Sequence, residues 1–411
     1  MARRLRRAGA RLGALVGSDA ATLRQGLGAL SISSIGDLLA GLTLGSITHT
    51  LDQLPGLLVL VPAAIGMRGN IFGALGSRLG TAIHAGTFTV SRRRDTVVGQ
   101  NLLASVALTL SVSLALAFLA KAVAVAFGVP ATISVVDFML ISMVGGALSS
   151  VIVLLITLGV AARSVSKGWD MDNVAAPLVT AAGDVVTLPS LFLATYLVGL
   201  GWFSPLLALA AAALSIAALV AALRAGLPVL RGIIRESLPV LLLAGAVDVL
   251  AGVTIEKRLE SFLVFPGLLV LVPPFLEDTG ALGGILSSRL SSKLHLGVIE
   301  PRNVPQRAAR ADFLLTFLYA VPVFVLLAVS ADIAATVANL ETPGVLRMVA
   351  VSLLGGFLAT IFAVGIAYYG AIVSFRLGLD PDNHGIPLIT SSMDLIGAFA
   401  LILAIVVVGV G

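Results

Sequence analysis

The chain has 411 residues, of which 58% are hydrophobic and only 11% are charged, and its formal net charge is +5 at pH 7. Soluble domains are about half apolar and a quarter charged, so this composition excludes an ordinary soluble protein. The chain contains no cysteine, which excludes a disulfide framework and a metal site built on thiolates.

Residues 1–27 form the first region, in which arginines are frequent and the apolar stretch is short. A secretory signal peptide also begins with basic residues, but it needs a longer apolar stretch and a cleavage site between small residues. We therefore interpret residues 1–27 as a basic cytoplasmic tail.

Long apolar segments follow one another from about residue 28 to the C-terminus. Each is long enough to cross the hydrocarbon core of a bilayer, which takes about 20 helical residues. Segments such as LLASVALTLSVSLALAFLA are apolar on every face, whereas a β-barrel needs short alternating strands. The sequence thus predicts an all-α polytopic membrane protein with about eleven helices, at residues 28–49, 55–85, 100–127, 136–162, 174–200, 204–223, 237–255, 264–296, 312–330, 347–373 and 384–410.

The loops between these helices indicate an orientation, because Lys and Arg are enriched on the cytoplasmic side of membrane proteins. With the N-terminus in the cytoplasm, SRRRD at 91–95 and EPRNVPQRAAR at 300–310 both fall on the basic side. The C-terminus is then external, and the plasma membrane is the expected location. Since topology explains the positive charge, the lipid bilayer is the expected partner and no nucleic acid is expected.

A repeat organises the chain, since the octet PGLLVLVP occurs at 55–62 and again at 266–273. The same offset of 211 residues aligns Asp37 with Asp248 and His84 with His295. An offset of 210 then aligns DMDNVAAPLVTAAGD with DPDNHGIPLITSSMD. Repetition on this scale predicts two structural repeats of five helices each.

The repeats are expected at residues 28–200 and 236–411, with residues 201–235 supplying one linking transmembrane helix and a cytoplasmic loop. Five helices alone would leave the second repeat inverted, whereas a sixth restores its orientation. The sequence therefore predicts parallel repeats about a pseudo-two-fold axis along the membrane normal, in a monomeric pseudo-dimer.

Several acidic residues fall at membrane depth, where each carboxylate costs at least about 2.5 to 3.5 kcal/mol. The repeat pairs Asp37 with Asp248 and Asp184 with Asp394, which places four carboxylates symmetrically about the axis. A cation near the axis would satisfy all four. The alternatives are helix capping or ion pairs with buried arginines. The full acidic set is Asp37, Asp184, Asp248, Asp394, Glu277 and Asp278.

Oxygen and amide groups accompany these acids, and hard divalent cations select such ligands. Asn70, Thr180 and Thr390 are candidate ligands, together with backbone carbonyls freed by Pro62 and Pro273. Mg²⁺ loses its water reluctantly, so a few carboxylates around a hydrated ion are chemically sensible. The missing cysteines disfavour soft metals.

Two histidines would argue for Zn²⁺ or Mn²⁺ instead. His84 and His295 fall near the cytoplasmic ends of their helices, so we assign them a structural role.

Two acidic loops precede the helices at 174–200 and 384–410. They carry Asp170 and Asp172 in the first repeat and Asp380 and Asp382 in the second. The D-x-D-N spacing lacks the glycine and the distal glutamate of an EF-hand, which is therefore rejected. Asp172 and Asp382 are expected to cap the helix N-termini, and the four aspartates would also concentrate cations at a cytoplasmic mouth.

The stretch PGLLVLVPAAIGMRGNIFGALGSRLGTAIHAG, together with D-x-D-N-x-x-x-P-L-x-T-x-x-x-D, resembles the membrane domain of the MgtE-type magnesium transporters and channels and of their eukaryotic solute-carrier relatives. The resemblance covers both halves of the chain. It implies five-helix units paired about a two-fold axis, with the second and fifth helices of each unit lining a Mg²⁺ pathway. It also implies that Mg²⁺ is the transported ion and that no organic cofactor is needed.

Carried over by position, the resemblance implies that Asp184 and Asp394 hold the ion and that Asn70 is the asparagine of the second helix. The second repeat departs from this pattern, because Ala281 replaces the asparagine and Glu277 and Asp278 stand where the first repeat has glycine and methionine. Unequal sides suit a carrier coupled to Na⁺ or H⁺ better than a symmetric channel.

The predicted function is thus divalent cation transport, with Mg²⁺ as the ion and either a channel or a coupled carrier as the mechanism. Transport of another divalent cation such as Mn²⁺ or Zn²⁺ is the nearest alternative. An intramembrane aspartyl protease is a third reading, since IGD at 35–37 and AGD at 182–184 place aspartates on separate helices. Four symmetric aspartates exceed a catalytic dyad, so no enzyme is expected. A structural scaffold would not explain why costly carboxylates recur in both halves.

Overall fold

The computed structural model describes residues 34–88, 93–167, 171–378 and 386–410. Every regular element in these residues is a helix. Ten helices within the described residues are long and apolar enough to cross a membrane. The predicted all-α polytopic fold is therefore confirmed.

Most of the spans match the predicted segments closely. They are α3 (Leu57–His84), α4 (Val97–Ala126), the continuous run of α5 (Val135–Leu140), the π-helix η1 (Ile141–Gly145) and α6 (Gly146–Lys167), α7 (Met171–Thr195), α8 (Phe203–Arg224), α9 (Pro228–Glu256), α11 (Gly267–His295), α12 (Arg307–Val337), α13 (Val345–Leu377) and α14 (Ile386–Val408). The predicted helix at 28–49 is described only from residue 34, and the chain is helical from there to residue 46. We call residues 34–46 the first-helix segment.

Besides the π-helix η1, three features were not predicted. The short helices α2 (Thr48–Gln53) and α10 (Leu259–Val264) precede α3 and α11, and they are too short to give a hydropathy signal. The predicted start of α9 at residue 237 is wrong, because the helix begins at Pro228. Proline is well suited to the first turn of a helix, where its missing N–H has no partner to lose.

The helix boundaries repeat along the chain as the sequence does. The last residues of equivalent helices are 211 positions apart for α2 and α10, for α3 and α11, and for α4 and α12. The first residues of α5 and α13 are 210 positions apart. The change of one residue therefore lies in the loop between α4 and α5, at 127–134, which is longer than its counterpart at 338–344.

Two glycines mark the contact between the halves. A Cβ atom added to Gly41 of the first-helix segment would collide with the carbonyl oxygen of Val270 on α11, and one added to Gly252 of α9 would collide with that of Val59 on α3. The two crossings are equivalent under the offset of 211. Such a reciprocal contact, in which each half offers both partners, is the signature of two-fold symmetry.

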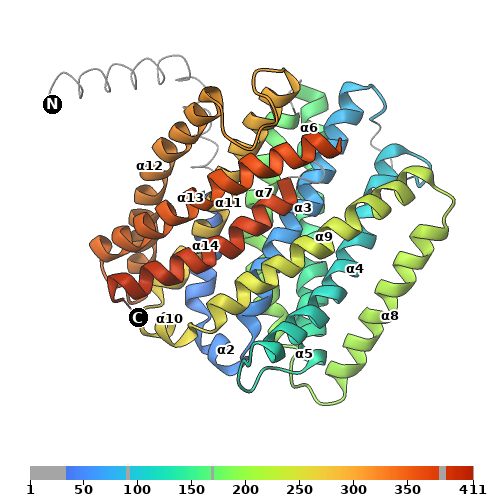
Figure 1. Ribbon diagram of the computed structural model, residues 1–411. Helices are drawn as coiled ribbons and strands as arrows, with labels where there is room; N and C mark the ends of the chain where they lie inside the picture. Colours follow the sequence, from blue (N-terminus) through green and yellow to red (C-terminus); the bar gives the residue numbers. More distant parts are fainter. Residues whose placement is uncertain (1–33, 89–92, 168–170, 379–385, 411) are drawn as a thin grey trace.

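The two halves run in the same direction. Six spans, from α3 to α9, separate the start of α3 from the start of α11, so both helices begin on the same side. Figure 1 shows α2 and α10 together at the lower end of the molecule, where α14 also ends. The exact division of the chain into domains stays a prediction.

Helix α8 is the span without a counterpart. Only 17% of the most apolar 18-residue stretch of α8 is buried. Figure 1 shows α8 at the edge of the bundle beside α4 and α5. Because its sequence is apolar on all sides, this helix suits a position facing lipid.

Candidate functional site

Four aspartates form two equivalent pairs inside the molecule. Asp37 of the first-helix segment lies beside Asp184 of α7, and Asp248 of α9 lies beside Asp394 of α14. The exposed fractions of Asp37, Asp184 and Asp248 are 1%, 2% and 0%. The two pairs are related by the repeat, since each joins the first helix of a half to the last helix of the same half.

Glu277 of α11 connects the two pairs. It interacts electrostatically with Asp37, Asp184, Asp248 and Asp394, and Asp184 also interacts with Asp394. Five carboxyl groups therefore share one region at the contact between the halves. Within the described residues, these groups interact with one another, with Asp278 and with polar groups, and not with Lys or Arg.

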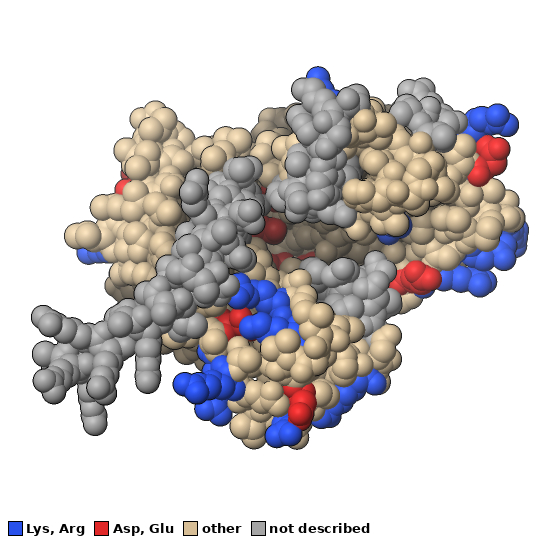
Figure 2. All heavy atoms as spheres, turned by 90° about the horizontal axis from the view of Figure 1, so that it is seen from above, with Lys and Arg blue, Asp and Glu red and all other residues tan. Residues whose placement is uncertain are grey.

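A small cavity lies among these acids, with a volume of about 30 Å³. Its lining includes Asp37, Asp184, Glu277, Asp394, Pro62 and Pro273. The two prolines are repeat equivalents inside α3 and α11. Each leaves a carbonyl one turn earlier without its helical hydrogen bond, which adds polar groups to the cavity region. Figure 2, a view from above, shows acidic atoms inside a hollow on that face of the molecule.

Glycine at position 66 leaves space beside the second acid pair. A Cβ atom added to Gly66 of α3 would lie 3.0 Å from Asp248 Oδ2 and 4.0 Å from Asp394 Oδ2. The equivalent residue on α11 is Glu277. One half thus provides room at this level, and the other provides a fifth carboxylate.

Several carboxylate oxygens of the two pairs have no hydrogen-bond donor among the described residues. Within the described part of the chain, both carboxylate oxygens of Asp37 and of Asp248 and one oxygen of Asp184 make no hydrogen bond. Ionised carboxylates only accept hydrogen bonds, so two that face each other cannot satisfy one another. Buried polar groups usually have partners, so each pair needs either a proton shared between its oxygens or a cation beside them.

The buried arginines do not neutralise these acids. Arg68 donates from Nε to Ser149 Oγ at 3.0 Å and from Nη2 to Ser113 Oγ at 3.3 Å. Arg78 Nε donates to Asn101 Oδ1 at 2.7 Å, and its equivalent Arg289 pairs with Asp312 at 3.1 Å. The alternative in which Arg68, Arg78 or Arg289 balances these acids therefore fails.

Asp278 has a different position from Glu277. It is 1% exposed, and Ser34 Oγ donates to its two carboxylate oxygens at 3.2 and 3.3 Å. This contact ties α11 to the first-helix segment. Asp278 is not among the residues that line the cavity.

The predicted threonine ligands lie where the second and fifth helices of each half meet. A Cβ atom added to Gly69 of α3 would lie 3.7 Å from the side chain of Thr180 on α7. One added to Gly280 of α11 would lie 3.7 Å from Thr390 on α14. Thr390 Oγ1 donates to the carbonyl of Pro387. Asn70 is half-buried on α3, and it is not part of the cavity lining.

The acidic loop residues cannot be judged in the same way. Asp170, Asp380 and Asp382 lie outside the described residues, and Asp172 belongs to α7 at a position whose side chain is not described. Their roles as helix caps or as a cytoplasmic mouth stay predictions.

The acids are arranged in pairs and not as a compact cage. Among the described residues, no group of three or more His, Cys, Asp or Glu side chains is close enough to hold a metal ion. His295 packs on Phe375 at a ring distance of 5.1 Å, and its Nδ1 lies 2.8 Å from the Ser291 carbonyl oxygen, which fits a structural role. Carboxylate oxygens around a small cavity are the kind of ligand that hard divalent cations select.

Comparison with known proteins gives a family. The MgtE family model, described as a divalent cation transporter, matches residues 61–194 and 272–404. Solute carrier family 41 member 3 of Rattus norvegicus is 25% identical over 401 residues, which cover 90% of this chain and 84% of the relative. Member 2 of the same family is 26% identical in Xenopus laevis and 25% in Homo sapiens, covering 69% and 68% of those relatives. No solved structure matches the chain.

The two matched stretches begin one residue before Pro62 and Pro273, and each reaches past the last helical aspartate of its half, Asp184 or Asp394. They include Pro62 of α3 and Pro273 of α11, and together they cover more than half of the chain. The protein therefore belongs to the MgtE family of divalent cation transporters.

Proposed function

We propose that this protein carries Mg²⁺ across the membrane along a pathway between its two halves, and that the paired aspartates and Glu277 form the negative lining of that pathway. The observation that supports this proposal is the set of five interacting carboxyl groups in one region, with which no described Lys or Arg interacts. Burying such charges is costly unless something compensates them. A divalent cation on the pathway compensates them.

The ligand chemistry favours Mg²⁺ over softer divalent cations. The groups near the cavity are carboxylates, hydroxyls and backbone carbonyls, which are the ligands of hard cations. A cavity of about 30 Å³ has room for one or two water-sized bodies. An octahedral ion with its full water shell is larger, so passage requires either loss of water or movement of α3 against α11. Mn²⁺ and Zn²⁺ are the competitors to test.

One observation supports the intramembrane protease hypothesis, and two oppose it. Asp37 and Asp184, which that reading requires to be adjacent, are indeed adjacent. The same adjacency recurs between Asp248 and Asp394, however, and a single dyad does not need a copy. Membership of a transporter family also favours transport.

We also propose that the end of the molecule bearing α2 and α10 faces outward, in the plasma membrane. The described basic residues support this orientation, since they are more numerous at the other end. That end carries Arg93, Arg94, Arg163, Arg224, Arg231, Arg235, Arg302, Arg307, Arg310 and Arg376, whereas the α2 and α10 end carries Lys121, Lys257, Arg258 and Arg347.

The direct test is Mg²⁺ uptake by proteoliposomes containing Asp184→Asn or Asp394→Asn. Each change removes one charge from a pair, and we expect the initial rate of uptake to fall at least about tenfold, which corresponds to about 1.4 kcal/mol of lost ion stabilisation. The melting temperature of the ion-free protein should stay equal or rise, because the substitution relieves repulsion between adjacent carboxylates.

Asp52→Asn is the matched control, because Asp52 is exposed on α2 and lies away from the cavity. Uptake by this variant should equal that of the unmodified protein. Unchanged uptake in both pathway variants would remove the assigned lining. The same vesicles, assayed with Mn²⁺ or Zn²⁺ as competitor, measure the selectivity.

A further inference from the structure

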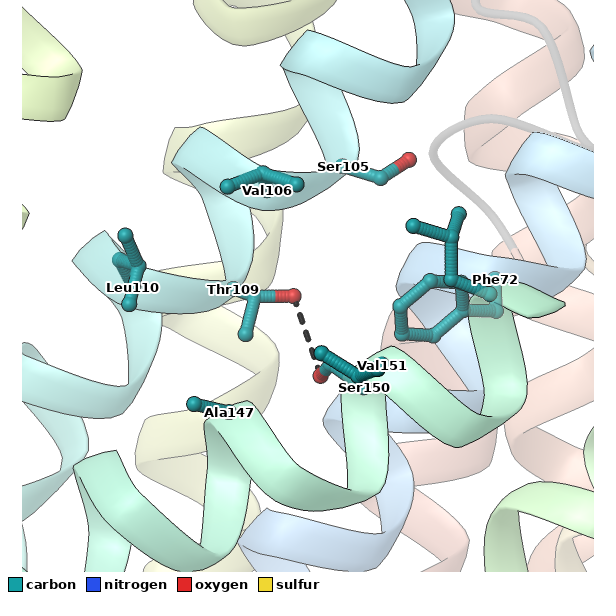
Figure 3. A pocket seen from close by; sticks show the side chains of 9 residues that line it. Phe72, Ser105, Val106, Thr109, Leu110, Ala147, Ser150 and Val151 are labelled. Atoms are coloured by element: carbon teal, nitrogen blue, oxygen red, sulfur yellow. Dashed lines mark hydrogen bonds between the residues drawn. The ribbon is translucent and has the colours of Figure 1, made fainter.

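A second pocket lies away from the acids, on the outer side of the first half. It has a volume of about 80 Å³ and is formed by α3, α4 and α6. Phe72 closes one side, Val106 and Thr109 come from α4, and Ala147 and Ser150 come from α6. Figure 3 shows these side chains around the open space, with the hydroxyls of Thr109 and Ser150 facing each other.

The polar atoms of this pocket are satisfied within the protein. Thr109 Oγ1 donates to Ser150 Oγ at 3.3 Å, and Ser105 Oγ donates to the carbonyl of Asn101 at 3.1 Å. No charged residue belongs to the lining. An apolar cavity of this kind stays dry and accepts apolar occupants, whereas a water needs two or more polar partners.

The pocket opens at the depth of the hydrocarbon core. Thr109 lies 12 residues after the start of α4, or about 18 Å along a helix whose total length is about 45 Å. Val106 is 45% exposed and Val151 is 56% exposed, so the rim is accessible from outside the bundle. In a bilayer, that outside is lipid.

The second half indicates what the space accommodates. Under the repeat, Phe317 of α12 is the equivalent of Val106, and Phe357 of α13 is the equivalent of Ala147. The rings of Phe317 and Phe357 pack against each other with centroids 5.6 Å apart. At these two positions, the second half therefore places its own hydrocarbon where the first half has smaller side chains and a pocket.

We propose that the pocket between α3, α4 and α6 binds an acyl chain of a bilayer lipid. The chain enters past Val106 and Val151 and occupies the space that the aromatic pair fills in the other half. Each methylene group buried there favours binding by about fourfold. The site is specific for the hydrocarbon part of the lipid, because the lining offers no charged group to a headgroup.

The test uses a phospholipid with a photoactivatable diazirine in its acyl chain, reconstituted with the full-length protein into liposomes. After illumination, mass spectrometry of peptides locates the adducts. In the unmodified protein, we expect adducts concentrated at residues 105–110 and 147–154. Ala147→Phe, which supplies the side chain found in the second half, should lower their yield at least about fivefold.

The reciprocal variant protects the test against a folding defect in Ala147→Phe. Phe357→Ala removes one ring of the aromatic pair and should create new adducts at 316–321 and 357–364, while those of the first half persist. Equal yields at both sites in all three proteins would overturn the proposal, because they would indicate ordinary contact with surrounding lipid. A crosslink between two copies of the chain at Ala147 would also overturn it, in favour of an interface between copies.

Discussion

At the scale of single residues, equivalent positions in the two halves carry different chemistry. Glu256 ends α9, is 7% exposed, and accepts hydrogen bonds from the backbone N–H groups of Gly56 at 2.7 Å and Leu58 at 3.1 Å. It therefore satisfies the first turn of α3, which belongs to the other half. Its repeat equivalent is Gly45, so only one of the two junctions has this carboxylate.

Glu256→Ala should destabilise the protein by about 2 to 4 kcal/mol, because two buried backbone donors lose their acceptor. Glu256→Gln, which keeps one acceptor oxygen, should lose about half as much. The measurement is thermal or denaturant unfolding in detergent micelles. Glu260→Ala is the control on the neighbouring helix α10, where the side chain is exposed and the expected change is within about 0.5 kcal/mol. A Glu256→Ala protein as stable as this control would contradict the capping role.

The acids illustrate how far residue-level prediction reached. A carboxylate in an apolar segment is conspicuous because of its cost, so Asp37, Asp184, Asp248 and Asp394 were identifiable from the sequence alone. Their arrangement into two adjacent pairs was not, because it depends on how helices far apart in the chain cross. The partners of Arg68 were missed for the same reason, since Ser113 and Ser149 are ordinary residues in apolar helices.

At the scale of elements, the crossings between the first helix of one half and the second helix of the other hold the halves together. Gly41 and Gly252 allow the backbones of these helices to approach closely, as small residues do in membrane helix packing. The obstacle that an added Cβ would meet is a backbone carbonyl in each case. Because backbone atoms move less easily than a flexible side chain, these two positions have little tolerance for a residue larger than glycine.

Gly41→Ala and Gly252→Ala should each destabilise the protein by at least about 1 to 3 kcal/mol, because the extra methyl group forces the two helices apart. Gly232→Ala is the matched control on α9, because a Cβ atom there would have no neighbour within 4 Å. It should be neutral or stabilising by up to about 1 kcal/mol, since glycine is a poor residue in a helix interior. Equal melting temperatures for the three variants would show that the crossings tolerate more space than the structure indicates.

Apolar content and segment length predicted the long helices well, since the apolar content of these helices is far above that of loops. The failures lie where local signals conflict or are too short. Arg231 and Arg235 indicated a cytoplasmic loop that reaches residue 235, yet the helix begins at Pro228 and continues through Pro239. The π-helix η1 was also missed, because the hydropathy of a π-turn equals that of an α-helical one.

At the scale of the whole molecule, the two halves share a fold and a direction but contribute unequally to the cavity among the acids. Glu277 comes from α11 alone, and α3 contributes Gly66 at the equivalent position. A symmetric channel has no use for this difference. A carrier closes its two ends in turn, and its inward-open and outward-open states need not be mirror images, so unequal halves are compatible with a carrier.

We therefore expect coupled transport. In proteoliposomes, an imposed Na⁺ or H⁺ gradient should accumulate Mg²⁺ beyond its own equilibrium, because a second cation would share the five carboxyl groups with it. Glu277→Gln should abolish this accumulation while leaving downhill Mg²⁺ flux measurable, and the Asp52→Asn protein should behave as the unmodified one. A luminal Mg²⁺ dye reports both fluxes. No accumulation under either gradient would favour a channel.

The reciprocal crossing of the halves also has a consequence for biosynthesis. Val59 leaves the ribosome about 190 residues before its partner Gly252, which is roughly 10 to 40 s of elongation. During that interval α3 is in the membrane without α9, the helix that later packs against it. In the same way, the first-helix segment is in the membrane before its partner α11 has been synthesised. The nascent first half must therefore stay incompletely packed until α9 and α11 have been synthesised.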